Sequence, residues 1–155
     1  MFEKEFMKKA ISLSQENIKK GGGPFGAVIV KDGKILATGC NRVTCNNDPT
    51  AHAEVSAIRK ACKKLKNFSL EGCEIYSSCE PCPMCLSAIY WAHIGKLYYG
   101  NTKKDAAKIG FDDSFIYDEL DLPAEKRKIP ALQHLHTEAL EAFNEWKKSE
   151  NKVEY

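Results

Sequence analysis

The sequence predicts an α/β domain of three layers, in which helices cover both faces of a central mixed sheet. The first observation is the element order, since helical and β-rich stretches alternate through the first hundred residues. The second is that the first two β-rich runs are apolar on both faces, as in strands buried between helices. The third is size: 155 residues, 43% of them hydrophobic, suit one domain spanning residues 1–155.

The chain should begin with a helix and a β-hairpin. Helical spacing relates the apolar residues Phe2, Phe6, Ala10 and Leu13. After the flexible stretch 21–24 (GGGP), the runs 25–30 (FGAVIV) and 35–40 (ILATGC) flank the pair Asp32 and Gly33. An Asp-Gly pair between two apolar runs favours a type I′ turn, because both central residues of that turn need positive φ. We therefore expect two antiparallel strands here.

A helix should follow the hairpin. Asp48 is a suitable N-cap and Pro49 suits the first helical position. The expected buried stripe of this helix consists of Val55, Ile58, Cys62 and Leu65.

The next part of the chain predicts two strands with a helix between them. Residues 73–78 (CEIYSS) and 96–100 (KLYYG) are the strands, and the helix starts at Pro81 and runs to about residue 92. The last third is less regular. Residues 137–148 look helical, with Leu140, Phe143 and Trp146 as candidates for an inward face.

Composition narrows the class of protein. The formal net charge of +2 gives no reason to expect a nucleic-acid partner. The N-terminal stretch lacks the apolar core of a signal peptide, and no run is long enough to span a membrane. Seven cysteines, an odd number, suit a reducing compartment in which thiols bind metals or are buried. We therefore expect a cytoplasmic protein.

Two short segments carry residues that can bind a metal. His52 and Glu54 lie in PTAHAEV, and Cys82 and Cys85 lie in EPCPMC. The two cysteines are one helical turn apart, so both sulfurs can reach one zinc ion. Cys79 has the same spacing, but the proline after Glu80 keeps the backbone there extended, so Cys79 belongs to the strand.

The alternative is a closed structural site in which three thiolates and His52 bind the metal, or in which Cys40 or Cys45 supplies the fourth ligand. Glu54 argues against it, because a structural site does not need a carboxylate beside the metal. Two thiolates and a neutral imidazole also bring the charge of the site near zero, so a bound water needs a nearby base. We expect one Zn²⁺ per subunit on His52, Cys82 and Cys85, with a reacting water at the fourth position.

The combination of H-x-E (His52–Ala53–Glu54) and P-C-x-x-C (81–85) is a signature of zinc nucleobase deaminases. The chain resembles the cytidine-deaminase-like superfamily over most of its length. PTAHAE and CEPCPMC resemble both the tRNA-adenosine deaminases and the bacterial guanine deaminases. The longer stretches NDPTAHAEVSAIRKAC, CEPCPMCLSAIYWA and DAAKIGFDDSFIYDE, with the tyrosine-terminated tail, resemble the guanine deaminases.

This resemblance implies the reaction of guanine with water to give xanthine and ammonia, with attack at C2 and Glu54 as the proton shuttle. It also implies a homodimer whose C-terminal segment, from about residue 111, is swapped onto the partner subunit. The candidates for holding the base are Phe25 and Trp91, whose aromatic rings can stack on a purine, and Asn41, Ala53, Asp113 and Tyr155. Asp113 is also a candidate for proton relay. Asp112 competes with Asp113, and each of these residues also has a plain structural interpretation in capping, turns or packing.

Two other functions stay open. One is deamination of an adenosine in tRNA, which would need a basic surface such as Lys103, Lys104 and Lys108 or residues 126–128. The other is a non-catalytic structural zinc module, for which Glu54 would be dispensable.

Overall fold

The computed structural model describes all of residues 1–155 and divides the chain into two compact units, Met1–Asp113 and Ser114–Tyr155. The first contains the whole sheet, and the second contains only helices and connecting segments.

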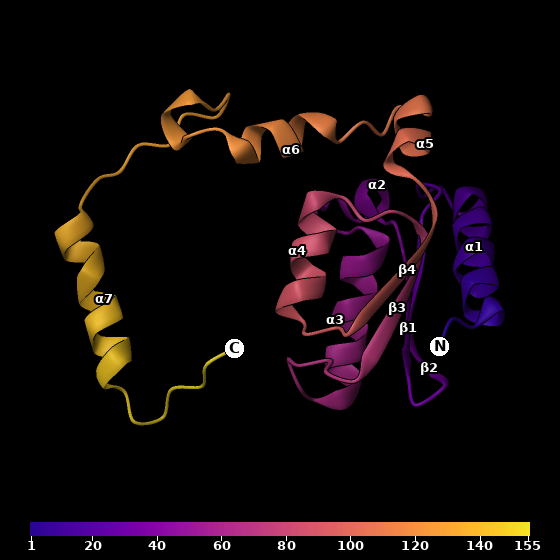
Figure 1. Cartoon of the computed structure of the whole chain (residues 1–155), viewed down its shortest axis with the longest axis horizontal. Coiled ribbons are helices and arrows are strands. Elements are labelled where there is room, and N and C mark those ends of the chain that lie inside the picture. Colours follow the sequence, from indigo (N-terminus) through magenta and orange to yellow (C-terminus); the bar gives the residue numbers. More distant parts are fainter. The chain divides into compact units, whose positions relative to one another are not determined.

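The first unit is built on a four-stranded mixed sheet of order β2-β1-β3-β4 (Figure 1). Its strands are β1 (Gly26–Lys31), β2 (Lys34–Cys40), β3 (Cys73–Cys79) and β4 (Lys96–Asn101). β1 pairs antiparallel with both β2 and β3, whereas β3 and β4 are parallel. The predicted mixed sheet is therefore confirmed.

The hairpin between β1 and β2 closes as its sequence predicts. Lys31 pairs with Lys34, and the two residues between them, Asp32 and Gly33, have φ of 50° and 69°. Positive φ at both positions is what a type I′ turn requires.

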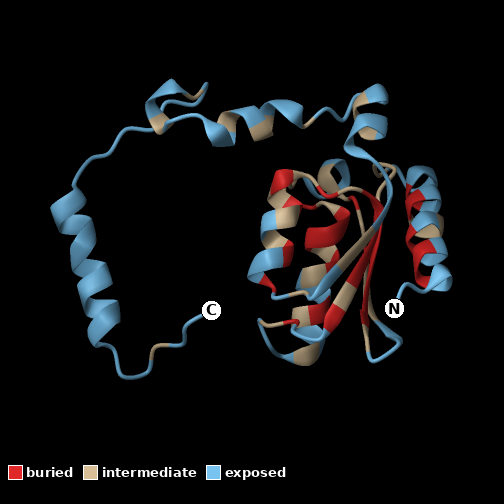
Figure 2. Ribbon diagram, in the orientation of Figure 1, coloured by how far each residue is buried: buried red, intermediate tan, exposed pale blue.

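Helices cover both faces of this sheet, as predicted (Figure 1). Helix α1 (Lys4–Lys19) covers one face, and α3 (Ala53–Leu65) and α4 (Pro83–Trp91) cover the other. The alternation along β1 explains the two cores, because Val28 contacts the α1 side and Ile29 contacts the α3 side. Buried residues therefore follow the two inner strands, β1 and β3, and the inner helix surfaces (Figure 2).

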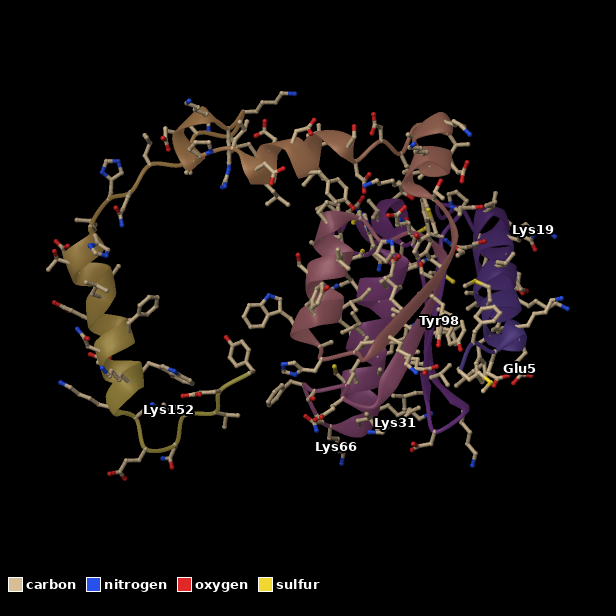
Figure 3. All side chains as sticks on the ribbon, in the orientation of Figure 1. Glu5, Lys19, Lys31, Lys66, Tyr98 and Lys152 are labelled. Carbon is tan, nitrogen blue, oxygen red and sulfur yellow. The ribbon has the colours of Figure 1, made fainter.

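Aromatic side chains strengthen the α1 face of the sheet. Tyr98, labelled in Figure 3, lies against the buried Tyr76 with ring centroids 4.7 Å apart. Phe6 from α1 meets the same Tyr76 ring edge-on at 5.5 Å. Such tilted and edge-on pairs are favourable arrangements of aromatic rings.

The buried stripe of α3 differs from the predicted one. Ala53, Ala57 and Ala61 are fully buried, whereas only Val55 of the predicted set is buried and Ile58, Cys62 and Leu65 are partly buried. The reason is a close approach of helix and strand at Gly39 of β2. A Cβ atom at Gly39 would collide with the backbone of Ala53 and Ala57, so small residues are needed on both sides.

Both helices of the second face begin later than predicted. Asp48 caps a turn instead, because its Oδ1 accepts hydrogen bonds from the Thr50 amide at 2.8 Å and hydroxyl at 2.7 Å, and α3 starts only at Ala53. Likewise α4 starts at Pro83, two residues after the predicted start. In each case a residue of the metal motif, His52 or Cys82, becomes the N-cap.

Two short helices complete the first unit. They are α2 (Val43–Asn46), after β2, and α5 (Lys103–Lys108), after β4. Thr102 and Asp105 form a capping box at the start of α5.

The second unit contains α6 (Ser114–Asp121), the 3₁₀ turn η1 (Ala124–Lys126) and α7 (His136–Lys148). The helix predicted over residues 137–148 is thus confirmed. Its predicted inward face is wrong for the single chain, since Leu140, Phe143 and Trp146 are exposed. No residue of Ser114–Tyr155 is buried (Figure 2). None of the helices in the chain has the length and apolar character needed to cross a membrane.

Candidate active site

The three predicted metal ligands converge at the beginnings of α3 and α4. His52 is the N-cap of α3, and Cys82 is the N-cap of α4, both with extended backbone (ψ 161° and 168°). Cys85 lies three residues into α4, on the side of Cys82. Nδ1 of His52 is 3.5 Å from each of the two sulfurs, and the three ligand atoms lie within 4.8 Å of one another.

This arrangement fits a zinc ion. Bond lengths of about 2.3 Å to sulfur and about 2.0 Å to nitrogen, at tetrahedral angles, place sulfur and nitrogen about 3.5 Å apart. The observed separations match that value. Two thiolates and one imidazole are the ligand set of an open zinc site, in which the fourth position is free for a reactant.

The thiols considered as a fourth ligand lie elsewhere. Cys40, Cys45 and Cys79 do not belong to the converging group, and each thiol donates to a backbone carbonyl, those of Leu13, Gly21 and Thr102 respectively. Burial raises the pKa of Cys79 to about 11, so its sulfur stays a neutral thiol. The converging group therefore offers two sulfurs to a metal, those of Cys82 and Cys85.

The two ligand sulfurs differ in acidity. A hydrogen bond from Cys85, together with the contact with His52, lowers the pKa of Cys82 to about 4 despite the opposing effect of burial. The same contact, together with burial, raises the pKa of Cys85. The site therefore stabilises one negative sulfur by itself, and a cation is needed to stabilise a second.

Glu54 lies on the first turn of α3, two residues after His52, and is 6% exposed. Burial raises the pKa of its carboxyl group. The Ser77 hydroxyl donates to its Oε1 at 2.8 Å. A buried carboxyl group with a raised pKa beside a metal site can both accept and return a proton.

These groups open into a cavity of about 310 Å³, the size of a small-molecule site. It lies within the first unit and is bounded by the segment before β1, the carboxyl ends of β2 and β3, the starts of α3 and α4, and the segment after α5. Its lining residues are Gly23, Phe25, Asn41, Val43, Thr44, His52, Glu54, Cys79, Glu80, Cys82, Lys103, Ala106, Phe111, Asp112 and Asp113.

Two predicted base-binding residues, Phe25 and Asn41, line this cavity. The backbone amide of Asn41 donates to the carbonyl of Phe25 at 3.1 Å, which holds the two residues side by side. Oδ1 of Asn41 accepts from the Val43 amide at 3.3 Å, so this side chain also stabilises the turn into α2. Asn41 therefore both stabilises a turn and lines the cavity.

Asp112 and Asp113 both line the cavity, but they differ in burial. Asp112 is exposed and Asp113 is half-buried. Burial raises the pKa of Asp113, and the nearby Cys82 thiolate raises it further. The environment of Asp113 is therefore perturbed, as expected for a functional carboxyl group.

The other predicted base-binding residues are placed differently. Ala53, the first residue of α3, is fully buried and joins His52 to Glu54. Trp91 is the last residue of α4, at the opposite end of that helix from Cys82, and does not line the cavity. Tyr155 belongs to the second unit.

Three residues near the site were missed from sequence. Ser77 contacts Glu54, Phe111 meets Phe25 edge-on with centroids 4.9 Å apart, and Glu80 accepts a hydrogen bond from the Lys103 amide at 3.0 Å. Ser77 could have been found, because polar residues at the carboxyl end of a strand in an open α/β sheet face the ligand crevice. No local pattern marks Phe111 or Glu80.

Known proteins share this fold and these motifs. A model of the cytidine and deoxycytidylate deaminase zinc-binding region matches residues 1–101. The guanine deaminase of Bacillus subtilis (strain 168) is 57% identical over the full length of both chains. A crystal structure of guanine deaminase from Bacillus subtilis superimposes with a TM-score of 0.97, covering 100% of this chain and 99% of that one. A tRNA-specific adenosine deaminase of Aquifex aeolicus (strain VF5) is 34% identical over 99% of both chains.

The family model covers the segment that holds His52, Glu54, Cys82 and Cys85, so the match and the geometry concern the same site. The chain belongs to the cytidine and deoxycytidylate deaminase family of zinc-binding enzymes.

Proposed function

We propose that this enzyme hydrolyses guanine to xanthine and ammonia. The observation that carries the proposal is the 57% identity to a guanine deaminase over the full length of both chains. Relatives named for tRNA adenosine are more distant, at 34% identity over a comparable length.

His52, Cys82 and Cys85 would hold the zinc ion, which when bound acidifies a water molecule and so supplies the nucleophile. Glu54 accepts the proton of that water on its buried carboxyl group. It then delivers the proton to the amino nitrogen at C2, which leaves as ammonia. Ser77 holds Oε1 of Glu54 during both transfers. Atoms balance, since guanine and water give xanthine and ammonia.

The base is held by residues on two walls of the cavity. Phe25 offers an aromatic face on which a purine can stack, and Asn41 offers an amide that can pair with a base edge. Asp113 accepts hydrogen bonds from the N–H groups of guanine. A carboxylate suits guanine better than adenine here, because guanine carries a ring N–H beside its exocyclic amino group whereas adenine has an unprotonated ring nitrogen there.

Deamination of adenosine in tRNA is the second candidate, favoured by the full-length Aquifex relative. The charge of the cavity weighs against it. Glu80, Asp112 and Asp113 line the cavity with Glu54, and Lys103 is the only lysine or arginine among the lining residues. A cavity with several carboxylates repels phosphates, whereas a neutral purine base is unaffected.

A homodimer with an exchanged C-terminal segment extends the proposal to the whole chain. Residues 114–155 have no buried side chain of their own, and α7 carries Leu140, Phe143 and Trp146 on its exposed surface. A 13-residue helix is marginal in water without a surface to pack against. The partner's first unit would supply that surface, and Tyr155 would then close the partner's cavity.

We also place the enzyme in the cytoplasm, because both ligand cysteines must stay reduced to bind zinc. All seven cysteines are unpaired in the structure, which is compatible with a reducing compartment.

The experiment that tests the function measures ammonia release by the zinc-loaded protein from guanine, guanosine, adenine, cytosine and cytidine. We expect turnover of guanine and its loss in Glu54→Gln, which should still bind one zinc ion per chain. Activity on an adenosine-containing tRNA stem-loop, without activity on guanine, would support the second candidate. If the zinc-loaded enzyme releases no ammonia from any of these substrates, both candidate functions are contradicted.

A further inference from the structure

Asn17, near the end of α1, is a buried polar residue that neither the zinc motif nor the cavity lining includes. It is 2% exposed. Its backbone carbonyl accepts hydrogen bonds from the amides of Lys20 and Gly22, both at 3.0 Å, which ends the helix. Its side chain makes a separate set of hydrogen bonds, to the loop that follows the helix and to Asn41.

The side-chain amide of Asn17 joins two segments that line the cavity. Nδ2 donates to the carbonyl of Gly23 at 2.8 Å and to the carbonyl of Asn41 at 2.7 Å. Gly23 precedes the cavity wall that contains Phe25, and Asn41 is itself a lining residue. One side-chain amide therefore connects both walls on which we place the base.

The contact is closely fitted. A Cβ atom at Gly22 would collide with Nδ2 of Asn17 and lie 2.5 Å from the carbonyl oxygen of Asn41. A glycine is thus required where the loop crosses the Asn17 side chain. A further hydrogen bond, from the Asn41 amide to the Phe25 carbonyl at 3.1 Å, joins the same two walls directly.

We propose that Asn17 is a positioning residue for base binding, which fixes the Phe25 wall against the Asn41 wall without touching the substrate. The proposal rests on the proposed function for the identity of the base, but not for the contacts. On this proposal, catalysis and base binding are organised by different parts of the fold. The starts of α3 and α4 hold the zinc ligands and Glu54, whereas the end of α1 sets the shape of the base site.

This role predicts a specific pattern in the kinetics. Loss of Asn17 should leave the zinc ligands and Glu54 in place, because none of its contacts reaches them. The walls should then lose their mutual alignment, and the base should bind less well. A purely structural role would reduce only the amount of folded, zinc-loaded enzyme, so KM and the kcat per bound zinc ion would both stay unchanged.

The test compares Asn17→Ala with the wild-type, zinc-loaded enzyme on guanine, with rates normalised to bound zinc. We expect KM to rise about tenfold with kcat within about twofold of wild type. Ser14→Ala is the matched control, since Ser14 lies on the same buried face of α1 and its hydroxyl donates only within the helix, to Ile11 at 2.8 Å. It should leave both constants unchanged.

Amide hydrogen exchange gives a readout that needs no substrate. In Asn17→Ala the amides of Gly22, Phe25 and Asn41 should exchange faster, while those of β3 stay protected. Gly22→Ala disturbs the same contact from the other side and serves if Asn17→Ala does not fold. Unchanged exchange at these amides, or an unchanged KM, overturns the proposal. If the wild-type enzyme does not hydrolyse guanine, the proposed function fails and exchange alone decides the role of Asn17.

Discussion

The hydroxyl of Ser77 donates a 2.8 Å hydrogen bond to Oε1 of Glu54, and both side chains are buried. Ser77 lies on β3 and Glu54 on α3, so the bond connects the sheet to the helix that covers it. A carboxyl group that moves a proton must keep its orientation through both transfers. The bond fixes one of its two oxygens, and with it the orientation of the carboxyl group.

Replacing Ser77 by alanine should therefore slow catalysis without removing the metal. A hydrogen bond to a charged group contributes about 1.5–3 kcal/mol, so we expect kcat to fall by about one to two orders of magnitude. Zinc content should stay at one ion per chain. The control is Ser78→Ala, because Ser78 is equally buried but accepts from the Gly26 amide, not from Glu54. Equal effects of the two substitutions would contradict an orienting role for Ser77.

The zinc ligands can be separated from their neighbour Cys79 by substitution. Cys85→Ser should lose the metal, since its sulfur is 3.5 Å from His52 Nδ1 within the converging group. Cys79→Ser should keep it, because the Cys79 thiol donates to the Thr102 carbonyl at 3.7 Å. Metal analysis of both proteins after dialysis checks this. Loss of zinc from Cys79→Ser would favour a closed site with three thiolates.

Asp113→Asn should raise the stability of the folded protein and lower its activity on guanine. Burial raises the pKa of Asp113, so ionising it in the folded protein costs free energy. The stability linked to its bound proton is present below the unfolded pKa of about 3.9 and is lost as the pH rises through the folded pKa.

At pH 7 Asp113→Asn should therefore melt at a higher temperature than wild type, and the difference should shrink towards pH 4. The same substitution should lower kcat/KM for guanine by about tenfold or more, because asparagine presents a donor where guanine also donates. Asp112→Asn, on the exposed neighbour, is the control. A lower melting temperature for Asp113→Asn at pH 7, or a larger kinetic effect at Asp112, would contradict the assignment.

The ligand set was predictable because its spacing is local. H-x-E and C-x-x-C each span at most four residues at the start of one helix, so the side chains that can reach one metal follow from the sequence alone. The helix starts were less predictable. Asp48 can cap either a helix or a turn, and its contacts with Thr50 decide in favour of the turn.

The contacts that support the site could not be predicted in the same way. Ser77 is 23 residues from Glu54, and Asn17 is 24 residues from Asn41, so their pairing depends on the strand order and on how α1 and α3 lie against the sheet. The inward face assigned to α7 failed for a related reason. Periodicity identifies an apolar stripe, but it does not say whether the covering surface belongs to the same chain.

The packing of α3 on β2 gives a prediction about stability. Gly39→Ala would push a Cβ atom into the backbone of Ala53 and Ala57, the part of α3 that carries Glu54. Overpacking of this kind costs about 1–3 kcal/mol, which in a chain of this size lowers the melting temperature by several degrees. Gly95→Ala is the control, since its Cβ would meet only the Cys73 carbonyl at an ordinary 3.7 Å. Similar thermal melts for the two variants would contradict the close approach.

The exchange of C-terminal segments can be tested by mixing two inactive enzymes. Glu54→Gln lacks the proton shuttle but keeps Tyr155, whereas Tyr155→Ala lacks the closing residue but keeps Glu54. If the tail of one chain covers the partner's cavity, a mixed dimer contains one complete site, formed by Glu54 of one chain and Tyr155 of the other. Equal mixing after reversible unfolding would then restore about a quarter of wild-type turnover, because half of the dimers are mixed and each has one working site. If each tail serves its own cavity, every site in the mixture lacks one residue, and turnover stays at the level of the separate variants.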